Sequence, residues 1–404
     1  MASDSSRPAA TPVLGDQRVL VVDDNPMNCD VLERRLRRLG LRHIDCVGDG
    51  AAAMERLRAQ PYDLVLLDLM MPVLDGFGVL TALRAEGQLP ELPVLMVSAA
   101  DEIDGVIRCI TLGAQDYLTK PIHAQLLEAR VRATLERKLL RDRIGEQLER
   151  TRRDLLAARR LQLSMVPPDQ PEPGPHGAVR VAARLTPARE IGGDLIDHFA
   201  LPGGHYLLAL GDVSGKGAEA ALCMARTVSL LRTLARQHWQ ERPDAEATLT
   251  AILADTNAAL CEGNDSALFV TLFVAIADPA TGRLSYACAG HPAPYVCTAE
   301  AVQALAAPAG LPIGLMPDYR AGVNTVALPA QSCLLAFSDG VTEAISAAGE
   351  LFGHARLEAL LGACSDRTPA GLLAAVGAGI AQFAANAEQS DDIALLAFAP
   401  AAAG

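Results

Sequence analysis

The pattern of hydrophobic and polar positions changes twice along this chain of 404 residues. In its first part, over 17–123, short runs of Val and Leu alternate with amphipathic stretches. Such alternation predicts a parallel sheet that helices cover on both faces. The clearest strand runs are 18–22, 63–68, 93–98 and 116–118, and the clearest helical stretches are Cys29–Leu39 and Ala51–Arg58.

A second pattern occupies about 122–166, where Arg, Glu, Leu and Ala dominate and proline is absent between Pro121 and Pro167. This pattern predicts a long helix, and we take 138–166 as a helical, coiled-coil-like linker. Apolar or small residues recur at gaps of four and three, which is a short heptad-like seam able to pair two copies into a homodimer. The alternative is a lone connector helix packed on its own domains. The seam consists of Ile144, Leu148, Thr151, Leu155 and Ala158, and its upstream continuation is broken by Arg137 and Arg141.

The third pattern begins after a Pro- and Gly-rich connector over 167–178, which ends the helix. Short strands at hairpin-like spacing and grouped helices predict an α+β layered domain over 179–400. The strand runs are 179–185, 205–213, 266–278, 284–290 and 332–340, and the helical stretches are 217–238, 244–262, 354–363 and 369–387.

Composition limits the class of protein. Half of the residues are hydrophobic, so two domains can each bury a core, and the net charge of -13 argues against non-specific binding to nucleic acid. No apolar run is long enough to span a bilayer, and residues 1–16 lack a signal pattern and predict a disordered tail. The nine scattered cysteines indicate reduced thiols. We therefore expect a cytoplasmic protein that binds neither nucleic acid nor a membrane.

Carboxylates gather at predicted strand ends in the first region. Asp23 and Asp24 directly follow one strand run and Asp68 ends another, where parallel folds place their binding sites. Such carboxylates repel one another unless a cation holds them, which indicates a divalent metal such as Mg²⁺. Asp68 would then be a nucleophile toward a phosphoryl group. Lys120 would offset charge on the phosphoryl oxygens, and the Ser98 hydroxyl would bond the attached phosphate.

Four segments in this order resemble the receiver domain of two-component response regulators: VVDDNPMN, LLDLMMPVLDGF, LMVSAAD and GAQDYLTKP. The resemblance covers 17–137 and implies a doubly wound, flavodoxin-like α/β fold with five parallel strands. It also implies Asp68 as the phosphoacceptor, Ser98 as the switch hydroxyl, Tyr117 as the switch aromatic and Lys120 as the site lysine.

The same resemblance implies the ligands of a receiver Mg²⁺, which are Asp24 directly, Asp23 through water, Asp68 and the Met70 carbonyl. It further implies a cis Pro121. The phosphoryl donor would be a sensor histidine kinase or a phosphotransfer protein. The alternative is a receiver-like fold that is not phosphorylated.

A second set of aspartates lies in the third region. Asp194 follows two glycines, Asp212 stands between a strand and a glycine-rich loop, Asp339 ends a strand, and Asp391 precedes the last strand. Two metals that share a carboxylate can activate water and clamp a phosphoryl group, and that chemistry needs about four carboxylates from distant strands.

These segments (EIGGDLIDHF, ALGDVSGKG, LLAFSDGVTEA and EQSDDIALLAF) resemble the SpoIIE-type branch of the PPM metal-dependent serine/threonine phosphatases. RLQLSMVPP, CAGHPAPYV and GLPIGLMP resemble further motifs of this branch. The resemblance implies a four-layer αββα fold with two Mn²⁺ or Mg²⁺ ions. Asp212 would bridge the two ions, the Val213 carbonyl would bind one, Asp339 and Asp391 would bind the other, and Asp194 would bind directly or through water.

Four other polar residues of this region have plainer interpretations. Asp197 is expected at the surface, because it would point away from Asp194 on a strand. Asp392 is expected to support its neighbours. His291 is either a general acid or, as we favour, a turn histidine satisfied by backbone. Lys216 either touches phosphate or faces solvent.

Together these features predict a response regulator in which phosphorylation of Asp68 controls a protein serine/threonine phosphatase through the long helix. The resemblance implies a phosphoserine protein as substrate, usually an anti-sigma-factor antagonist. The alternative is a phosphorylation-controlled adaptor that captures a sigma factor or an antagonist and in which the second domain is not catalytic. Because all four aspartates are retained, the enzyme is favoured. A guanylate cyclase output lacks any matching motif.

Overall fold

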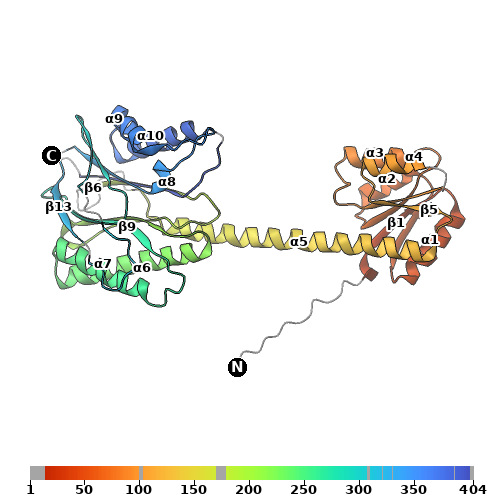
Figure 1. Cartoon of the computed structure of the whole chain (residues 1–404), viewed down its shortest axis with the longest axis horizontal. Coiled ribbons are helices and arrows are strands. Elements are labelled where there is room, and N and C mark those ends of the chain that lie inside the picture. The colour runs from red at the N-terminus through yellow and green to blue at the C-terminus, as the bar shows by residue number, and fades with distance from the viewer. Residues whose placement is uncertain are drawn as a thin grey trace, which may run out of the picture. The chain divides into compact units, whose positions relative to one another are not determined.

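The computed structural model describes residues 14–99, 103–169, 179–306, 310–320, 322–329, 331–385 and 387–400. Most of the tail expected over 1–16 and of the connector expected over 167–178 lies outside these ranges. The chain divides into two compact units, Met1–Thr151 and Arg152–Gly404, and each is described by itself (Figure 1). No helix of the described ranges is long and apolar enough to cross a membrane.

The first unit contains a five-stranded parallel sheet in the order β2-β1-β3-β4-β5, as predicted. Its strands are β1 (Arg18–Val22), β2 (His43–Val47), β3 (Leu64–Asp68), β4 (Val94–Ala99) and β5 (Asp116–Lys120). Its helices are α1 (Pro26–Arg38), α2 (Gly50–Ala59), α3 (Gly76–Ala85), α4 (Ile103–Leu112) and the first part of α5 (Ala124–Met165).

Helices cover both faces of this sheet (Figure 1). One buried cluster packs α1 and the start of α5 against the sheet, through Leu32, Leu36 and Val131 among others. The other packs α2 and α3 against the opposite face, through Met54 and Leu80 among others. The prediction of a doubly wound α/β fold is therefore confirmed.

Helix α5 continues for 42 residues without interruption. Its first turns are buried, since Leu127, Val131 and Leu135 are at most 1% exposed. Farther along, Ile144 and Leu148 of the heptad-like seam are 57% and 65% exposed. These two side chains are exposed, and both pairing with a second copy and the alternative of a lone connector helix stay predictions.

The second unit contains two five-stranded antiparallel sheets, in the orders β13-β10-β9-β8-β7 and β12-β11-β14-β15-β6. The strands are β6 (Val179–Thr186), β7 (Leu195–Ala200), β8 (Tyr206–Val213), β9 (Val270–Asp278), β10 (Arg283–Ala289), β11 (Tyr295–Cys297), β12 (Val302–Ala304), β13 (Asn324–Ala327), β14 (Cys333–Phe337) and β15 (Ile393–Pro400). The helices are α6 (Ala218–Glu241), α7 (Ala245–Cys261), α8 (Asp339–Thr342), α9 (Gly353–Ala363) and α10 (Pro369–Ala384).

Three buried clusters hold this unit together as four layers. One fills the space between the two sheets, with Phe273 and Phe398 among its largest side chains. A second packs α6 and α7 on the first sheet, and a third packs α9 and α10 on the second sheet. The predicted αββα architecture is confirmed, and it brings the ends of β8, β14 and β15 close to one another.

The expectation that Asp197 lies at the surface is wrong. Asp197 is fully buried, because α6 covers this face of β7. Its two carboxylate oxygens each accept a hydrogen bond of 2.6 Å from the Arg232 guanidinium, whose residue lies on α6. This bidentate pair joins β7 to α6, and the sequence offered no local sign of it because its partners are far apart in the chain.

Candidate functional site

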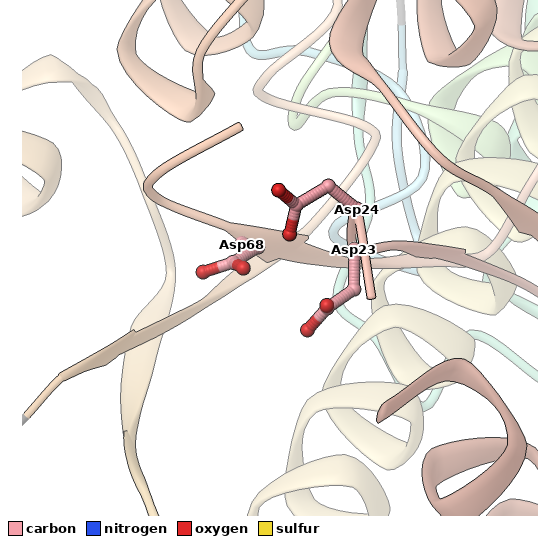
Figure 2. Close-up of side chains that lie close together, drawn as sticks. All are labelled: Asp23, Asp24 and Asp68. Atoms are coloured by element: carbon pink, nitrogen blue, oxygen red, sulfur yellow. The ribbon is translucent and has the colours of Figure 1, made fainter. Parts of the chain in front are cut away.

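Three carboxylates converge at the carboxyl edge of the first sheet (Figure 2). Asp23 and Asp24 follow β1 and Asp68 ends β3, and β1 and β3 are parallel neighbours. One oxygen from each of the three lies within 4.8 Å of the others. Asp23 and Asp68 are buried, whereas Asp24 is exposed. An all-oxygen donor set of this size, open on one side, fits a single Mg²⁺ that keeps some of its waters.

Two further side chains hold this carboxylate cluster. The Lys120 ammonium lies 2.7 Å from an Asp68 oxygen and 3.0 Å from an Asp23 oxygen. The Asn28 side-chain amide donates to Asp23 at 2.9 Å. Burial raises the pKa of Asp68, while the hydrogen bond and charge of Lys120 act to lower it. Part of the negative charge is thus already balanced by the protein itself.

The structure places the other receiver residues as follows. Ser98, near the end of β4, is 1% exposed, and its hydroxyl has no hydrogen-bond partner among the described residues. Tyr117 on β5 is 41% exposed. Met70 follows Asp68, the last residue of β3, by two positions and is 64% exposed. The Lys120–Pro121 peptide is cis.

Four aspartates meet in the second unit. Asp194 precedes β7, Asp212 lies near the end of β8, Asp339 begins α8 after β14, and Asp391 precedes β15. Among the described residues, the receiver trio is the one group of three or more possible ligands whose atoms all lie within 4.8 Å of one another, so these four are more widely spaced. Chemistry with two cations needs about four carboxylates from distant strands, and the charges of these aspartates lie close enough to shift one another's titration.

The electrostatics of this second cluster also fit metal ions. Burial, with the charges of Asp339 and Asp391, raises the pKa of Asp212 to about 7. Burial and the charge of Asp212 raise the pKa of Asp194 well above its usual range. Burial and Asp391 raise the pKa of Asp339. Burial and repulsion between neighbouring negative charges disfavour the ionised form of these carboxylates. Cations that bind among them would stabilise the ionised form.

Asp392 supports the loop that precedes β7, in line with the role expected for it. Its two oxygens accept hydrogen bonds of 2.8 Å from the backbone amides of Ala188 and Gly193. A Cβ on Gly192 would lie 1.7 Å from an Asp392 oxygen, so only glycine fits there. This contact holds the GGD turn in place, and with it Asp194, whose carboxylate accepts a hydrogen bond of 2.7 Å from Ser338.

A cavity of about 290 Å³ opens beside these carboxylates. Asp212 and Asp391 line it together with two cationic side chains, Lys216 and Arg189. Lys216 lies 3.2 Å from an Asp391 oxygen, so it does not simply face solvent. Arg189 is exposed and forms no ion pair with any described residue, which leaves its guanidinium available to a phosphoryl oxygen.

His291 is buried behind the cluster and does not line this cavity. Its Nδ1 lies 3.0 Å from the Thr271 hydroxyl, which is 3.5 Å from the Asp212 carbonyl. Burial lowers the pKa of His291 to about 3, so the ring is neutral. Its position favours support of β8 and β9 over proton transfer to a substrate.

The last turns of α5 reach the second cluster through Gln162. This residue is 4% exposed. Its side-chain amide donates to the Gly192 carbonyl at 2.7 Å and accepts from the Gly192 amide at 3.1 Å. The linker helix is therefore hydrogen-bonded to the turn that carries Asp194.

Sequence reasoning missed Asn28, Arg189, Gln162 and Ser338 as contributors to the two clusters. Gln162 lies in the RLQLSMVPP segment that had been noted, and Arg189 lies five residues before Asp194. Neither position carries a local pattern that distinguishes a site residue from a surface polar residue. Their roles follow from contacts that the tertiary structure makes.

Comparisons with known proteins identify both regions. Residues 19–132 match the family model of the response regulator receiver domain, and residues 202–400 match that of Stage II sporulation protein E (SpoIIE). The second unit also has the fold of the SiaA-PP2C domain of Pseudomonas aeruginosa, with a TM-score of 0.51 and 21% identity over 64% of this chain and 98% of that one.

The curated relatives match parts of the chain. The probable transcriptional regulatory protein TcrX of Mycobacterium tuberculosis is 41% identical over 119 residues, which are 30% of this chain and 50% of TcrX. Protein IcfG of Synechocystis is 29% identical over 197 residues, which are 44% of this chain and 31% of IcfG. The chain thus spans about half the length of TcrX and 31% of the length of IcfG.

These findings confirm the predicted pair of domains and the predicted class of the second one, a PPM-type, metal-dependent serine/threonine phosphatase domain. This chain therefore joins a response regulator receiver domain, over 19–132, to a SpoIIE-type domain, over 202–400, that has the PP2C fold.

Proposed function

We propose that this protein is a response regulator in which phosphorylation of Asp68 controls hydrolysis of a phosphoserine protein by the second domain. One observation carries the proposal. Asp194, Asp212, Asp339 and Asp391 come from four separate places in the chain, and burial together with the charges of neighbouring aspartates raises the pKa of Asp194, Asp212 and Asp339. Asp212 and Asp391 line a cavity at which the unpaired cation of Arg189 also lies.

In the receiver, the Asp68 carboxylate attacks the phosphorus of a phosphorylated histidine on the kinase or phosphotransfer protein, and the phosphorus–nitrogen bond breaks. Asp23, Asp24, Asp68 and the Met70 carbonyl would hold Mg²⁺, which supplies positive charge to the phosphoryl oxygens. Lys120, now paired with Asp68 and Asp23, would pair with the new phosphoryl group. The Ser98 hydroxyl would donate to it, since it has no other partner among the described residues.

In the second domain, water attacks the phosphorus of phosphoserine and the serine oxygen leaves. Asp212, Asp194, Asp339, Asp391 and the Val213 carbonyl would hold two Mn²⁺ or Mg²⁺ ions, which supply Lewis acidity for this attack. Arg189 would bind the phosphoryl oxygens and orient them. Asp392 keeps the GGD turn in position throughout.

Helix α5 offers a physical route for control. It contributes residues to both units as one continuous helix, and Gln162 fastens its last turns to Gly192 beside Asp194. A rotation or shift of this helix would therefore move the turn that positions a metal ligand. Exposed Ile144 and Leu148 support pairing of two copies along α5, so that phosphorylation would act through dimerisation.

The expected partners follow from these two activities: a histidine kinase or phosphotransfer protein as donor, and a phosphoserine protein of the anti-sigma-factor antagonist class as substrate. The expected place of action is the cytoplasm. Capture by the Asp212→Asn protein, used as a substrate trap in an extract of the source cell, should identify the substrate.

The coupling is tested by measuring hydrolysis of p-nitrophenyl phosphate and of a phosphoserine peptide with Mn²⁺, in the presence and absence of beryllofluoride. We expect the analogue to change the rate and the oligomeric state measured by light scattering. An unchanged rate and mass would overturn the coupling but not the phosphatase. Absence of hydrolysis under all conditions would favour the adaptor role.

A further inference from the structure

A second cavity, of about 390 Å³, lies beside the carboxylate-lined cavity in the SpoIIE-type domain. The two share a wall, because Glu388, Gln389 and Ser390 line both. We call the second one the α10 cavity, since residues of α10 form one of its sides. A segment of a bound protein that occupies one cavity can therefore continue directly over this wall into the other.

The α10 cavity is mainly apolar. Helix α10 contributes Ile380, Ala381 and Ala384, and the opposite side is formed by Ile345 and Ile393. The alanines leave room that larger side chains would fill. An apolar hollow that opens to solvent is characteristic of a binding site, because a protein gains nothing by keeping such surface wet.

Two charged residues line the α10 cavity. Arg184, on the edge strand β6, forms no ion pair with any described residue, and Glu388 belongs to the shared wall. A Cβ on Gly377 of α10 would lie 3.2 Å from the Arg184 guanidinium, so the arginine lies close against this helix. The apolar floor thus has a cation at its edge that an acidic group of a ligand could meet.

We propose that the α10 cavity binds an apolar side chain that neighbours the phosphoserine in the protein substrate. The inference rests on the proposed phosphatase function. The carboxylates and Arg189 would act on the phosphoryl group, which is the same in every phosphoserine protein. Selectivity between substrates therefore requires contacts with residues that neighbour the phosphoserine. The α10 cavity is placed for this contact, because the shared wall leaves only three residues between it and the carboxylate-lined cavity.

The test uses the full chain with Mn²⁺ and beryllofluoride. Its probes are phosphoserine peptides of one sequence that carry Leu or Asp at each of the three positions on either side of the phosphoserine, and p-nitrophenyl phosphate, which has no flanking residues. For the unchanged protein we expect kcat/KM to favour Leu at one or more positions by about tenfold or more, the scale that apolar pockets supply.

Two variants of α10 complete the test. Ala381→Trp fills the cavity and should abolish the preference for Leu while leaving p-nitrophenyl phosphate hydrolysis unchanged. Ala378→Trp places the same side chain at an exposed position of α10 that does not line the cavity, and should keep the preference. Ala381→Gln, a smaller change, should weaken the preference if the tryptophan variant folds poorly.

If the unchanged protein shows no preference for Leu in kcat/KM, the proposal is overturned. It is also overturned if the preference for Leu survives in both Ala381→Trp and Ala381→Gln. In either case, hydrolysis of p-nitrophenyl phosphate would still support the phosphatase. Failure to hydrolyse p-nitrophenyl phosphate or any peptide would instead count against the phosphatase function, and the proposal would fall with it.

Discussion

The receiver and the SpoIIE-type domain both gather aspartates at strand ends, but they balance the resulting charge differently. In the receiver, Lys120 pairs with two of the three carboxylates and Asn28 donates to one of them. In the second domain, four carboxylates share the hydroxyl of Ser338 and the ammonium of Lys216, and burial raises the pKa of three of them.

This difference matches two kinds of chemistry. A carboxylate that must itself attack phosphorus needs a nearby cation that can move to the product, and Lys120 is such a cation. Carboxylates whose task is to hold metal ions can remain under-compensated, because the metals complete the balance when they bind. The comparison therefore predicts that changes in the two clusters have separable consequences.

The largest expected effect comes from removing the proposed central metal ligand of each cluster in turn. Asp212→Asn should lower hydrolysis of p-nitrophenyl phosphate more than about 100-fold, because it removes a charge that would hold both metals. Asp68→Asn should leave basal hydrolysis within about twofold and remove the response to acetyl phosphate or beryllofluoride, as the altered side chain cannot accept the phosphoryl group. Comparable loss of basal hydrolysis in both variants would contradict separate roles.

A smaller but specific effect is expected at Gln162. Gln162→Met keeps the size of the side chain and loses both hydrogen bonds to Gly192. We expect an apparent affinity for Mn²⁺ that is weaker by up to about 30-fold in the hydrolysis assay, since the two lost bonds contribute on the order of 1 kcal/mol each to the position of the turn. Gln162→Glu, which keeps the acceptor and loses the donor, should be intermediate. An unchanged Mn²⁺ dependence would show that α5 is not coupled to the site through this contact.

Metal binding should stabilise the second domain more than the receiver. Saturating Mn²⁺, at about 100 times its dissociation constant, should raise the free energy of unfolding by about 2.7 kcal/mol for one site, and more where two ions bind. A truncated protein that contains only the receiver lacks the unfolding transition of the second domain, which assigns that transition in the full chain. Calorimetry of the full chain with Mn²⁺ or with EDTA should then show the larger upward shift in the transition of the second domain. Equal shifts in both transitions would contradict the difference in charge balance.

The smallest predicted difference contrasts two buried serines. Ser338 donates to Asp194 and accepts from the Ala394 amide, so Ser338→Ala should lower the free energy of unfolding by about 1–3 kcal/mol. Ser98 has no partner among the described residues, so Ser98→Ala should change it by less than about 0.5 kcal/mol. Chemical denaturation measures both free energies.

Ser98→Ala should nevertheless weaken the response of hydrolysis to beryllofluoride. A full response in this variant would exclude the Ser98 hydroxyl from the switch.

Much of the receiver was readable in the sequence because its signals are local. Continuous apolar runs predicted β1, β3 and β4, and the polar residues at their ends predicted the carboxylate site. Strand β2 was absent from these runs, since its residues HIDCV are half-buried or exposed and interrupt the apolar pattern. Its existence followed only from the resemblance to five-stranded receivers.

In the second domain, the sequence predicted strands, helices and the four aspartates, but not their supports. Asp197 shows the limit, since a strand period alone pointed it outward while α6 buries it against Arg232. The role of Asp392 could be expected from the resemblance, yet its contacts with Ala188 and Gly193 span about 200 positions of the chain.

The sequence by itself determined the order of domains, the long helix between them and the aspartates of both clusters, because these are properties of residue type and local spacing. The tertiary structure decided which groups compensate those aspartates and what lies beside them: Lys120 on Asp68, Ser338 on Asp194, Gln162 on Gly192, and the α10 cavity. The physical reason is that hydrogen bonds, ion pairs and cavities depend on distances between segments remote in the chain, and no local pattern encodes those distances.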